Sequence, residues 1–410
     1  MRAAANTLRI AYPLHWSRLN RQACQEQSVN TAAALARRGH QVTLLMPKGP
    51  RDPALTAAEV ADYFGVQGEF RLVQRASPWG GTNAVSSGLW LQRSFGDPEV
   101  RAADLILSRI PMLLAMGLIS PVPFAIDQYR PWTDDLPSLR PLIRRMAARA
   151  QCLALIIHSE HAARSYRRAG VPPEKILVAH NGAEPRHMDP PLSIAAARAR
   201  LGLPLERPIA VYAGRVNRDK GLDQLFAVAR LRPNILFLLV GSQGDGAIER
   251  TARAVENVRT VPWQEPPALP PWLYAADMLL IPPSRAPLER HGNCVLPMKL
   301  FGYLAAGRPI VAPRSPDTAE LLEHERTALL VPPGSPAAAA AALDRILADA
   351  GLAGRLAAAS RQLSEGLSWD VRARRISDFL AERIGAAPRP RARPGSALGP
   401  QQHPPAGQHT

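Results

Sequence analysis

The sequence predicts an α/β protein with two domains, each built around a parallel sheet. Short apolar runs alternate with helical patterns in both halves of the chain, and many of these runs end in glycine, proline, serine or a basic residue. The length of 410 residues fits two domains of roughly 100–200 residues each. Because ligands of such sheets bind at the carboxyl ends of the strands, we expect functional residues in the loops that follow the apolar runs.

The first domain, assigned to residues 1–184, opens with a strand, a helix and a second strand. The first strand covers 8–12, the helix covers 24–38 and stops at Gly39, and the next strand covers 41–46. This unit starts a Rossmann-like sheet. Further elements are a helix at 160–169 and strands at 71–74, 104–108, 123–126, 153–158 and 175–179.

The second half repeats this organisation after a proline-rich linker at 185–206, which includes a short helix at 193–201. The second domain covers 207–366 and contains a strand at 209–213, a helix at 222–231 and an alanine-rich helix at 336–349. A last helix lies within 367–385, at 368–384. Residues 386–410 contain many prolines and arginines but no acidic residue, so they predict a disordered tail.

The composition of the chain indicates what kind of partner it binds and in which cellular compartment it works. A formal net charge of +16 fits an anionic partner, and it equally fits a coding bias toward arginine. Cys24, Cys152 and Cys294 lie far apart and form no C-x-x-C pair, so we expect a reducing cytoplasm and neither disulfides nor a zinc site. No apolar leader opens the chain, and the apolar stretch 111–126 is shorter than the ~20 residues that span a bilayer.

A basic glycine-containing loop at 214–221 carries the clearest chemistry. It links the strand at 209–213 to the helix at 222–231, and a helix N-terminus presents backbone N–H groups to anions. Arg215 adds a planar guanidinium fork and Lys220 adds a point charge. The loop therefore predicts a phosphate-binding site, with a solvated turn as the alternative.

Several strings taken together resemble one family. They are Gly214-Arg215, Lys220-Gly221, Val240-Gly241 and Pro297–Phe301, with Ser159-Glu160 and His180–Ala183 upstream. As a set they resemble retaining GT-B glycosyltransferases of the group 1 or family 4 type, over roughly residues 8–380. The resemblance implies two Rossmann-like domains facing across a cleft, an acceptor domain followed by a nucleotide-sugar donor domain. It implies no metal or other cofactor, and no D-x-D pair for a metal occurs in the sequence.

The resemblance also assigns roles to individual residues. Arg215 and Lys220 would stabilise the leaving diphosphate during catalysis. Asp127 follows the strand that faces the acceptor and is either an acceptor-orienting carboxylate or a loop cap. Val261 and Trp263 would line the base pocket, with packing in the core as the alternative for Trp263. The expected donor-binding residues are Gly214, Gly241, Val261, Pro297, Lys299 and Gly302.

Two carboxylates typical of the family are missing. Cys294 and Gly302 occupy their positions, and the second of these glutamates accepts hydrogen bonds from the donor ribose. The loss of two charge-assisted hydrogen bonds costs donor binding about 1.5–3 kcal/mol each. Two functions therefore stay open. One is an active hexosyltransferase, and the other is a catalytically degenerate GT-B protein that binds a sugar nucleotide or a partner and regulates another transferase.

For the active enzyme, the sequence predicts a nucleotide-sugar donor and a saccharide or lipid-linked acceptor, in surface polysaccharide or glycoconjugate biosynthesis. The expected location is the cytoplasm. The basic amphipathic stretch 139–149 either contacts anionic lipid at the inner membrane face or is a solvated surface helix. A dehydrogenase is disfavoured because no G-x-G-x-x-G fingerprint occurs, and a nucleic-acid partner because no known binding module is present.

Overall fold

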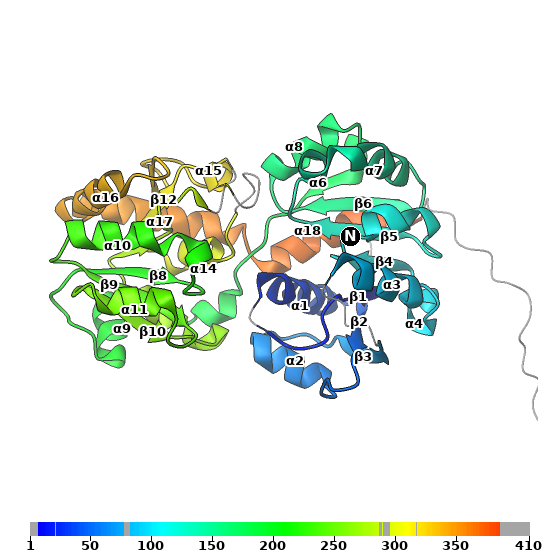
Figure 1. Ribbon diagram of the computed structural model, residues 1–410, viewed down its shortest axis with the longest axis horizontal. Coiled ribbons are helices and arrows are strands. Elements are labelled where there is room, and N and C mark those ends of the chain that lie inside the picture. Colours follow the sequence, from blue (N-terminus) through cyan, green and yellow to red (C-terminus); the bar gives the residue numbers. More distant parts are fainter. Residues whose placement is uncertain are drawn as a thin grey trace, which may run out of the picture.

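The computed structural model describes residues 7–20, 22–77, 83–286, 289, 296–316 and 318–385. Within them the chain forms two α/β domains that lie next to each other (Figure 1). The predicted tail at 386–410 and the predicted family position Cys294 lie outside the described residues.

The first domain is built on a seven-stranded sheet in the order β3-β2-β1-β4-β5-β6-β7. Every neighbouring pair of strands is parallel, as predicted. The strands are β1 Arg9–Pro13, β2 Gln41–Lys48, β3 Arg71–Ala76, β4 Leu105–Ser108, β5 Phe124–Gln128, β6 Cys152–Ile157 and β7 Ile176–Val178. The strand order reverses between β1 and β4, and such a switch point opens a crevice at the carboxyl ends of the two strands.

The second domain repeats this topology with a six-stranded parallel sheet in the order β10-β9-β8-β11-β12-β13. Its switch point lies between β8 and β11. The strands are β8 Ile209–Ala213, β9 Leu236–Ser242, β10 Val258–Pro262, β11 Met278–Leu280, β12 Ile310–Pro313 and β13 Leu329–Val331. Both sheets fit the predicted pair of Rossmann-like domains.

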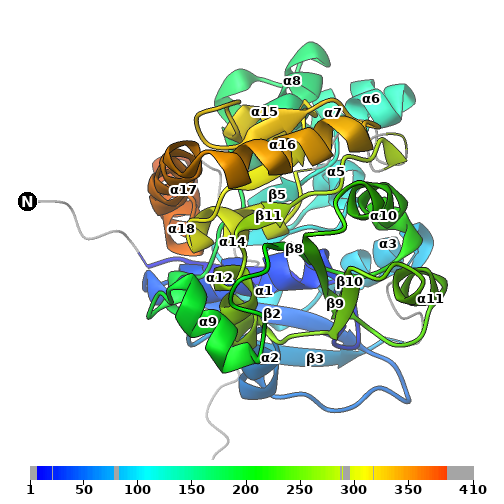
Figure 2. The same cartoon turned by 90° about the vertical axis from the view of Figure 1, so that its left-hand side faces the viewer.

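Helices cover both faces of each sheet, so each domain has two apolar layers. The first-domain helices are α1 Ala23–Arg37, α2 Ala57–Phe64, α3 Ala84–Ser94, α4 Pro98–Ala102, α5 Leu113–Met116, α6 Trp132–Asp135, α7 Arg140–Ala147 and α8 Glu160–Arg168. The second-domain helices are α9 Ile194–Leu201, α10 Leu222–Leu231, α11 Ala247–Arg253, α12 Pro270–Tyr274, α14 Lys299–Ala306, α15 Thr318–Leu321, α16 Pro336–Ala348 and α17 Ala350–Glu365. Figure 2 shows α10, α11 and α16 on one face of the second sheet and α9, α12 and α14 on the other.

The last helix, α18 Trp369–Ile384, returns to the first domain and packs against α1 (Figure 1). Its buried residues Trp369, Ile376 and Leu380 belong to the first-domain core. The chain passes between the two domains twice, after Gly182 and before α18. These two segments touch at Gly182, where an added Cβ atom would lie 2.3 Å from the Ser368 backbone. A glycine is therefore required at the point where the domains are connected.

None of the helices within the described ranges is long and apolar enough to cross a bilayer. The basic helix α7 buries Ile143 and Met146 and pairs Arg140 with Asp134 at 3.3 Å. This arrangement fits a surface helix, and lipid contact stays a prediction.

Candidate functional site

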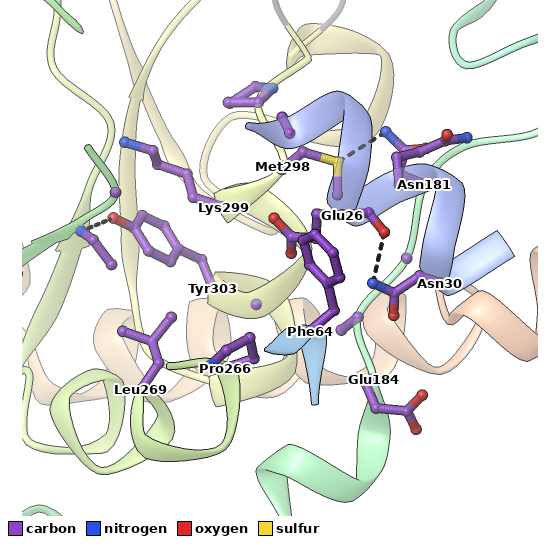
Figure 3. Close-up of a pocket in the computed structure, with 18 of the residues that line it drawn as sticks. Glu26, Asn30, Phe64, Asn181, Glu184, Pro266, Leu269, Met298, Lys299 and Tyr303 are labelled. Carbon is purple, nitrogen blue, oxygen red and sulfur yellow. Dashed lines mark hydrogen bonds between the residues drawn. The ribbon is translucent and has the colours of Figure 1, made fainter. Parts of the chain in front are cut away.

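A cavity of about 560 Å³ lies between the two domains, at the carboxyl ends of their strands (Figure 3). The first domain contributes the start of α1 and the residues directly after β4, β5 and β6, which are Arg109, Tyr129 and His158. The second domain contributes the loops after β8 and β10, the end of β9, and one side of α12 and α14. The volume is within the range of small-molecule sites, roughly 300–1,000 Å³.

Three cationic side chains from the second domain line this cavity. They are Arg215 and Lys220, in the loop after β8, and Lys299, the first residue of α14. The Lys299 ammonium lies 3.5 Å from the centre of the Tyr212 ring. Burial and the nearby Lys220 charge hold the pKa of Lys299 well below its usual value. Of the described carboxylates, none is within ion-pair distance of Lys299, so a bound anion is the partner that would stabilise its charge.

Two predicted glycines bring the cationic loop into place. Gly214 has φ +137°, and an added Cβ atom would lie 2.9 Å from Nζ of Lys299. Gly241 has φ +123°, and its Cβ atom would lie 2.4 Å from the carbonyl oxygen of Gly214. The Gly214 N–H donates to the carbonyl of Val240 at 2.8 Å. These glycines let the turn after β8 approach the end of β9 closely, which shapes the wall beside Lys299.

The other predicted donor residues divide into two groups. Pro297 and Gly302 line the cavity, and the nearest neighbour of a Cβ atom added to Gly302 is Cδ1 of Leu273, at 3.7 Å. An added Cβ atom therefore makes only an ordinary van der Waals contact at position 302. Val261 is 8% exposed, belongs to the second-domain core and is not among the residues that line the cavity, so it does not have its predicted position in the base pocket. Trp263, two residues further on, lines the cavity instead.

Asp127 has neither of its two predicted roles. It lies within β5 at 1% exposure and is not among the residues that line the cavity. Arg372 of α18 donates to both carboxylate oxygens, at 3.0 and 2.9 Å, and Gln27 donates at 2.6 Å. Burial alone would raise the pKa of Asp127, but the charges of Arg372 and Arg109 hold it below its usual value. Asp127 is thus one half of a buried ion pair that ties α18 to the first domain.

Sequence reasoning missed the first-domain wall of the cavity. Glu26 and Asn30, one helical turn apart on α1, line it with Arg109 and His158. Burial, helped by the Arg109 charge, lowers the pKa of His158 to about 3, so this imidazole is neutral. Burial raises the pKa of Glu26 to about 7. One available signal was the segment from Gln25 to Thr31, which is polar except for Val29 and is unusual on a helix that packs into a core.

Family models match both halves of the chain. Residues 26–187 match the model described as Glycosyltransferase Family 4, and residues 207–349 match the one described as Glycosyl transferases group 1. Two solved structures share the fold over 92% of this chain. They are sucrose-phosphate synthase from Thermosynechococcus elongatus (TM-score 0.70, 20% identity, 99% of that chain) and Anabaena HepE in complex with UDP-glucose (TM-score 0.68, 15% identity, 100% of that chain).

Curated relatives include two D-inositol 3-phosphate glycosyltransferases. The protein of Streptomyces bingchenggensis is 31% identical over 240 residues, which cover 54% of this chain and 51% of the relative. That of Jonesia denitrificans is 28% identical over 338 residues, which cover 78% and 75%. In several such matches the chain spans about half the length of the curated relative. Fold and cavity define a two-domain GT-B protein. The chain belongs to the group 1 and family 4 glycosyltransferases.

Proposed function

We propose that the protein transfers a sugar from a nucleotide diphosphate donor to a saccharide or lipid-linked acceptor, with retained configuration and without a metal. The observation that carries this proposal is the group of Arg215, Lys220 and Lys299 around Gly214, in a cavity between two GT-B domains. The group lies at the carboxyl end of β8, next to the switch point of the second sheet.

These cations would act on the leaving group. When the bond between the sugar and the diphosphate breaks, negative charge grows on the diphosphate. Cationic side chains that already face this position stabilise the charge without having to rearrange. The loop 214–221 leads directly into α10, whose N-terminal N–H groups add further donors for phosphate oxygens. Anabaena HepE, with the same fold, is known in complex with UDP-glucose, which supports a uridine nucleotide as the first donor to test.

The acceptor would enter along the first-domain wall. Some curated relatives are named D-inositol 3-phosphate glycosyltransferases. Another, LpsE of Rhizobium meliloti, is named a lipopolysaccharide core biosynthesis glycosyltransferase. LpsE is 31% identical over 168 residues, which cover 40% of this chain and 46% of LpsE. These names support a polyhydroxylated acceptor and a place in surface glycoconjugate synthesis.

A second function is favoured by one observation. Helix α14 has Gly302 at the position of the ribose-binding glutamate, so this helix offers no carboxylate there. A degenerate protein of this kind would bind a nucleotide or a partner, and would regulate another transferase, without turning over a donor.

Calorimetric titration with UDP, GDP, ADP and CMP tests the donor site. We expect one nucleotide to bind selectively, and Arg215→Ala/Lys220→Ala to abolish that binding. The matched control is Arg218→Ala, because Arg218 is exposed in the same loop and does not line the cavity. Failure of every nucleotide to bind would reject the donor site. Binding without hydrolysis or transfer of any matching nucleotide sugar would favour the regulatory protein.

A further inference from the structure

The first-domain wall of the cavity carries a carboxylate that the proposed mechanism does not use. Glu26 lies in the first turn of α1, and Figure 3 shows its side chain pointing away from α1 toward the helix that carries Lys299 and Tyr303. No described residue donates a hydrogen bond to this carboxylate or forms an ion pair with it. Its acceptor capacity is therefore available to a ligand.

The position of Glu26 is fixed by its own helix. The Asn30 side chain donates to the Glu26 carbonyl at 2.8 Å (Figure 3). The preceding loop is held by Gln25, which accepts from the Asn20 N–H at 2.9 Å and donates to the Arg18 carbonyl at 3.0 Å. The carboxylate is thus presented to the cavity from a rigid element, which lowers the cost of ordering it on binding.

The surroundings of Glu26 determine what it can bind. Phe64 of α2 and Met298, next to α14, line the cavity beside it and limit its access to water (Figure 3). Burial accordingly raises its pKa to about 7. The Lys299 ammonium, which lies over the Tyr212 ring, forms no ion pair with this carboxylate. A carboxylate accepts hydrogen bonds and repels anions, and an adjacent aromatic ring offers an apolar surface. A sugar ring provides hydroxyl donors on its edge and an apolar C–H face.

We propose that Glu26 binds adjacent hydroxyl groups of a sugar ring in the cavity and excludes a phosphate group from the same position. The inference rests on the proposed function. The ring belongs either to the donor, as its ribose or its transferred sugar, or to the acceptor, and in each case the recognition chemistry is the same.

The test is Glu26→Gln in the full chain, which keeps the size of the side chain and removes its charge. Calorimetry is performed with pyrophosphate, UDP and UDP-glucose, and with myo-inositol and D-inositol 3-phosphate in the presence of UDP. If Glu26→Gln weakens the binding of UDP at least about tenfold more than the binding of pyrophosphate, Glu26 binds the ribose. The same loss for UDP-glucose but not UDP identifies the transferred sugar. Weaker myo-inositol binding, or tighter D-inositol 3-phosphate binding, identifies the acceptor.

Two controls separate this inference from its alternatives. Glu69→Gln removes an exposed first-domain carboxylate outside the cavity and should change none of these affinities. Without ligand, Glu26→Gln should melt at the same temperature as the native protein or higher, so weaker binding would not reflect misfolding. If pyrophosphate binds and needs Arg215 and Lys220, but Glu26→Gln alters no sugar-bearing ligand, this inference is overturned and the proposed function stands. If pyrophosphate and every nucleotide fail to bind, the proposed function fails as well.

Discussion

Nε2 of His180, just after β7 of the first domain, lies 2.6 Å from Oε1 of Glu320, on α15 of the second domain. The same carboxylate accepts hydrogen bonds from the backbone N–H groups of Glu160 and His161, at 2.7 and 3.0 Å. The second domain thus caps the N-terminus of a first-domain helix. Burial alone would raise the pKa of Glu320, but these hydrogen bonds hold it below its usual value. The contact links the two domains and is strongest while Glu320 is ionised.

Glu320→Gln should weaken this contact between the domains. The amide keeps one acceptor oxygen but loses the charge that favours the α8 N-terminus, so we expect a loss of about 1–3 kcal/mol in the free energy of unfolding. Chemical denaturation measures the loss, and small-angle scattering measures any increase in the radius of gyration. Glu365→Gln, at the exposed end of α17, is the control. An unchanged stability and an unchanged radius would show that the contact contributes nothing in solution.

Acidification should act on the same contact. Because the folded-state pKa of Glu320 is depressed, its contribution to stability is present above the unfolded value, near 4.5, and is lost as the pH falls through the folded value. The native protein should therefore lose more stability than Glu320→Gln on going from pH 6 to pH 3. Parallel stability curves for the two proteins over this range would contradict the assignment.

Glu26 should show the opposite pH dependence. Its folded pKa, about 7, is above its ordinary value of 4.5, so the folded state binds the proton more tightly. Stability should then fall as the pH rises from 4.5 to 7, by at most about 3.5 kcal/mol at about 1.4 kcal/mol per pKa unit. Glu26→Gln should remove this fall and be the more stable protein at pH 8. Thermal denaturation of both proteins at pH 4.5 and pH 8 checks this prediction. The same change in stability between the two pH values in both proteins would reject it.

The buried ion pair between Asp127 and Arg372 should be strongly cooperative. Removal of one partner leaves an uncompensated buried charge, so Asp127→Asn or Arg372→Met should each cost about 3–5 kcal/mol of stability. The double variant should lose less than the sum of the two single losses. Where each protein is still folded, nucleotide affinity should be unchanged, because neither residue lines the cavity. A variant that stays stable but loses acceptor binding would restore the acceptor role predicted for Asp127.

Residues of the site that lie close together in the sequence could be predicted, and residues whose partners lie far away in the chain could not. The strand at 209–213 and the helix at 222–231 were predicted with the bounds of β8 and α10, because an apolar run, a basic turn and an amphipathic helix follow one another directly. Asp127 was misassigned because its partner lies 245 residues away in the chain. Glu26 was missed because the side of α1 that faces the cavity depends on how the two domains pack. Helix α17 was missed because it buries only Leu352, Leu356 and Ser360, which leaves little apolar periodicity.

Gly241→Ala should disrupt nucleotide binding although it adds a single methyl group. The Cβ atom would lie 2.4 Å from the Gly214 carbonyl oxygen, and the backbone at position 241 has φ +123°, so the turn after β8 and the end of β9 must separate. We expect at least a tenfold loss of affinity for the nucleotide that the native protein binds, roughly 1.4 kcal/mol. Gly354→Ala is the matched control, since Gly354 lies in α17 with no atom within 4 Å of the added Cβ, and it should be neutral or slightly stabilising. Equal nucleotide affinities in both variants would contradict the close approach.

Gly302→Glu distinguishes an active transferase from a degenerate one. The Cβ atom makes only an ordinary contact, because its nearest neighbour is 3.7 Å away, and replacement of a glycine within α14 favours the helix. If the native protein lacks an essential ribose partner, the variant should bind its nucleotide more tightly and gain donor turnover. We expect instead that affinity stays the same or falls, since Glu26 already provides a carboxylate from the opposite wall and a second one adds like-charge repulsion. Titration of Gly302→Glu and of Glu26→Gln/Gly302→Glu with UDP separates these cases. If UDP affinity rises only in the double variant, a single carboxylate is enough to bind the nucleotide, and either wall of the cavity can provide it.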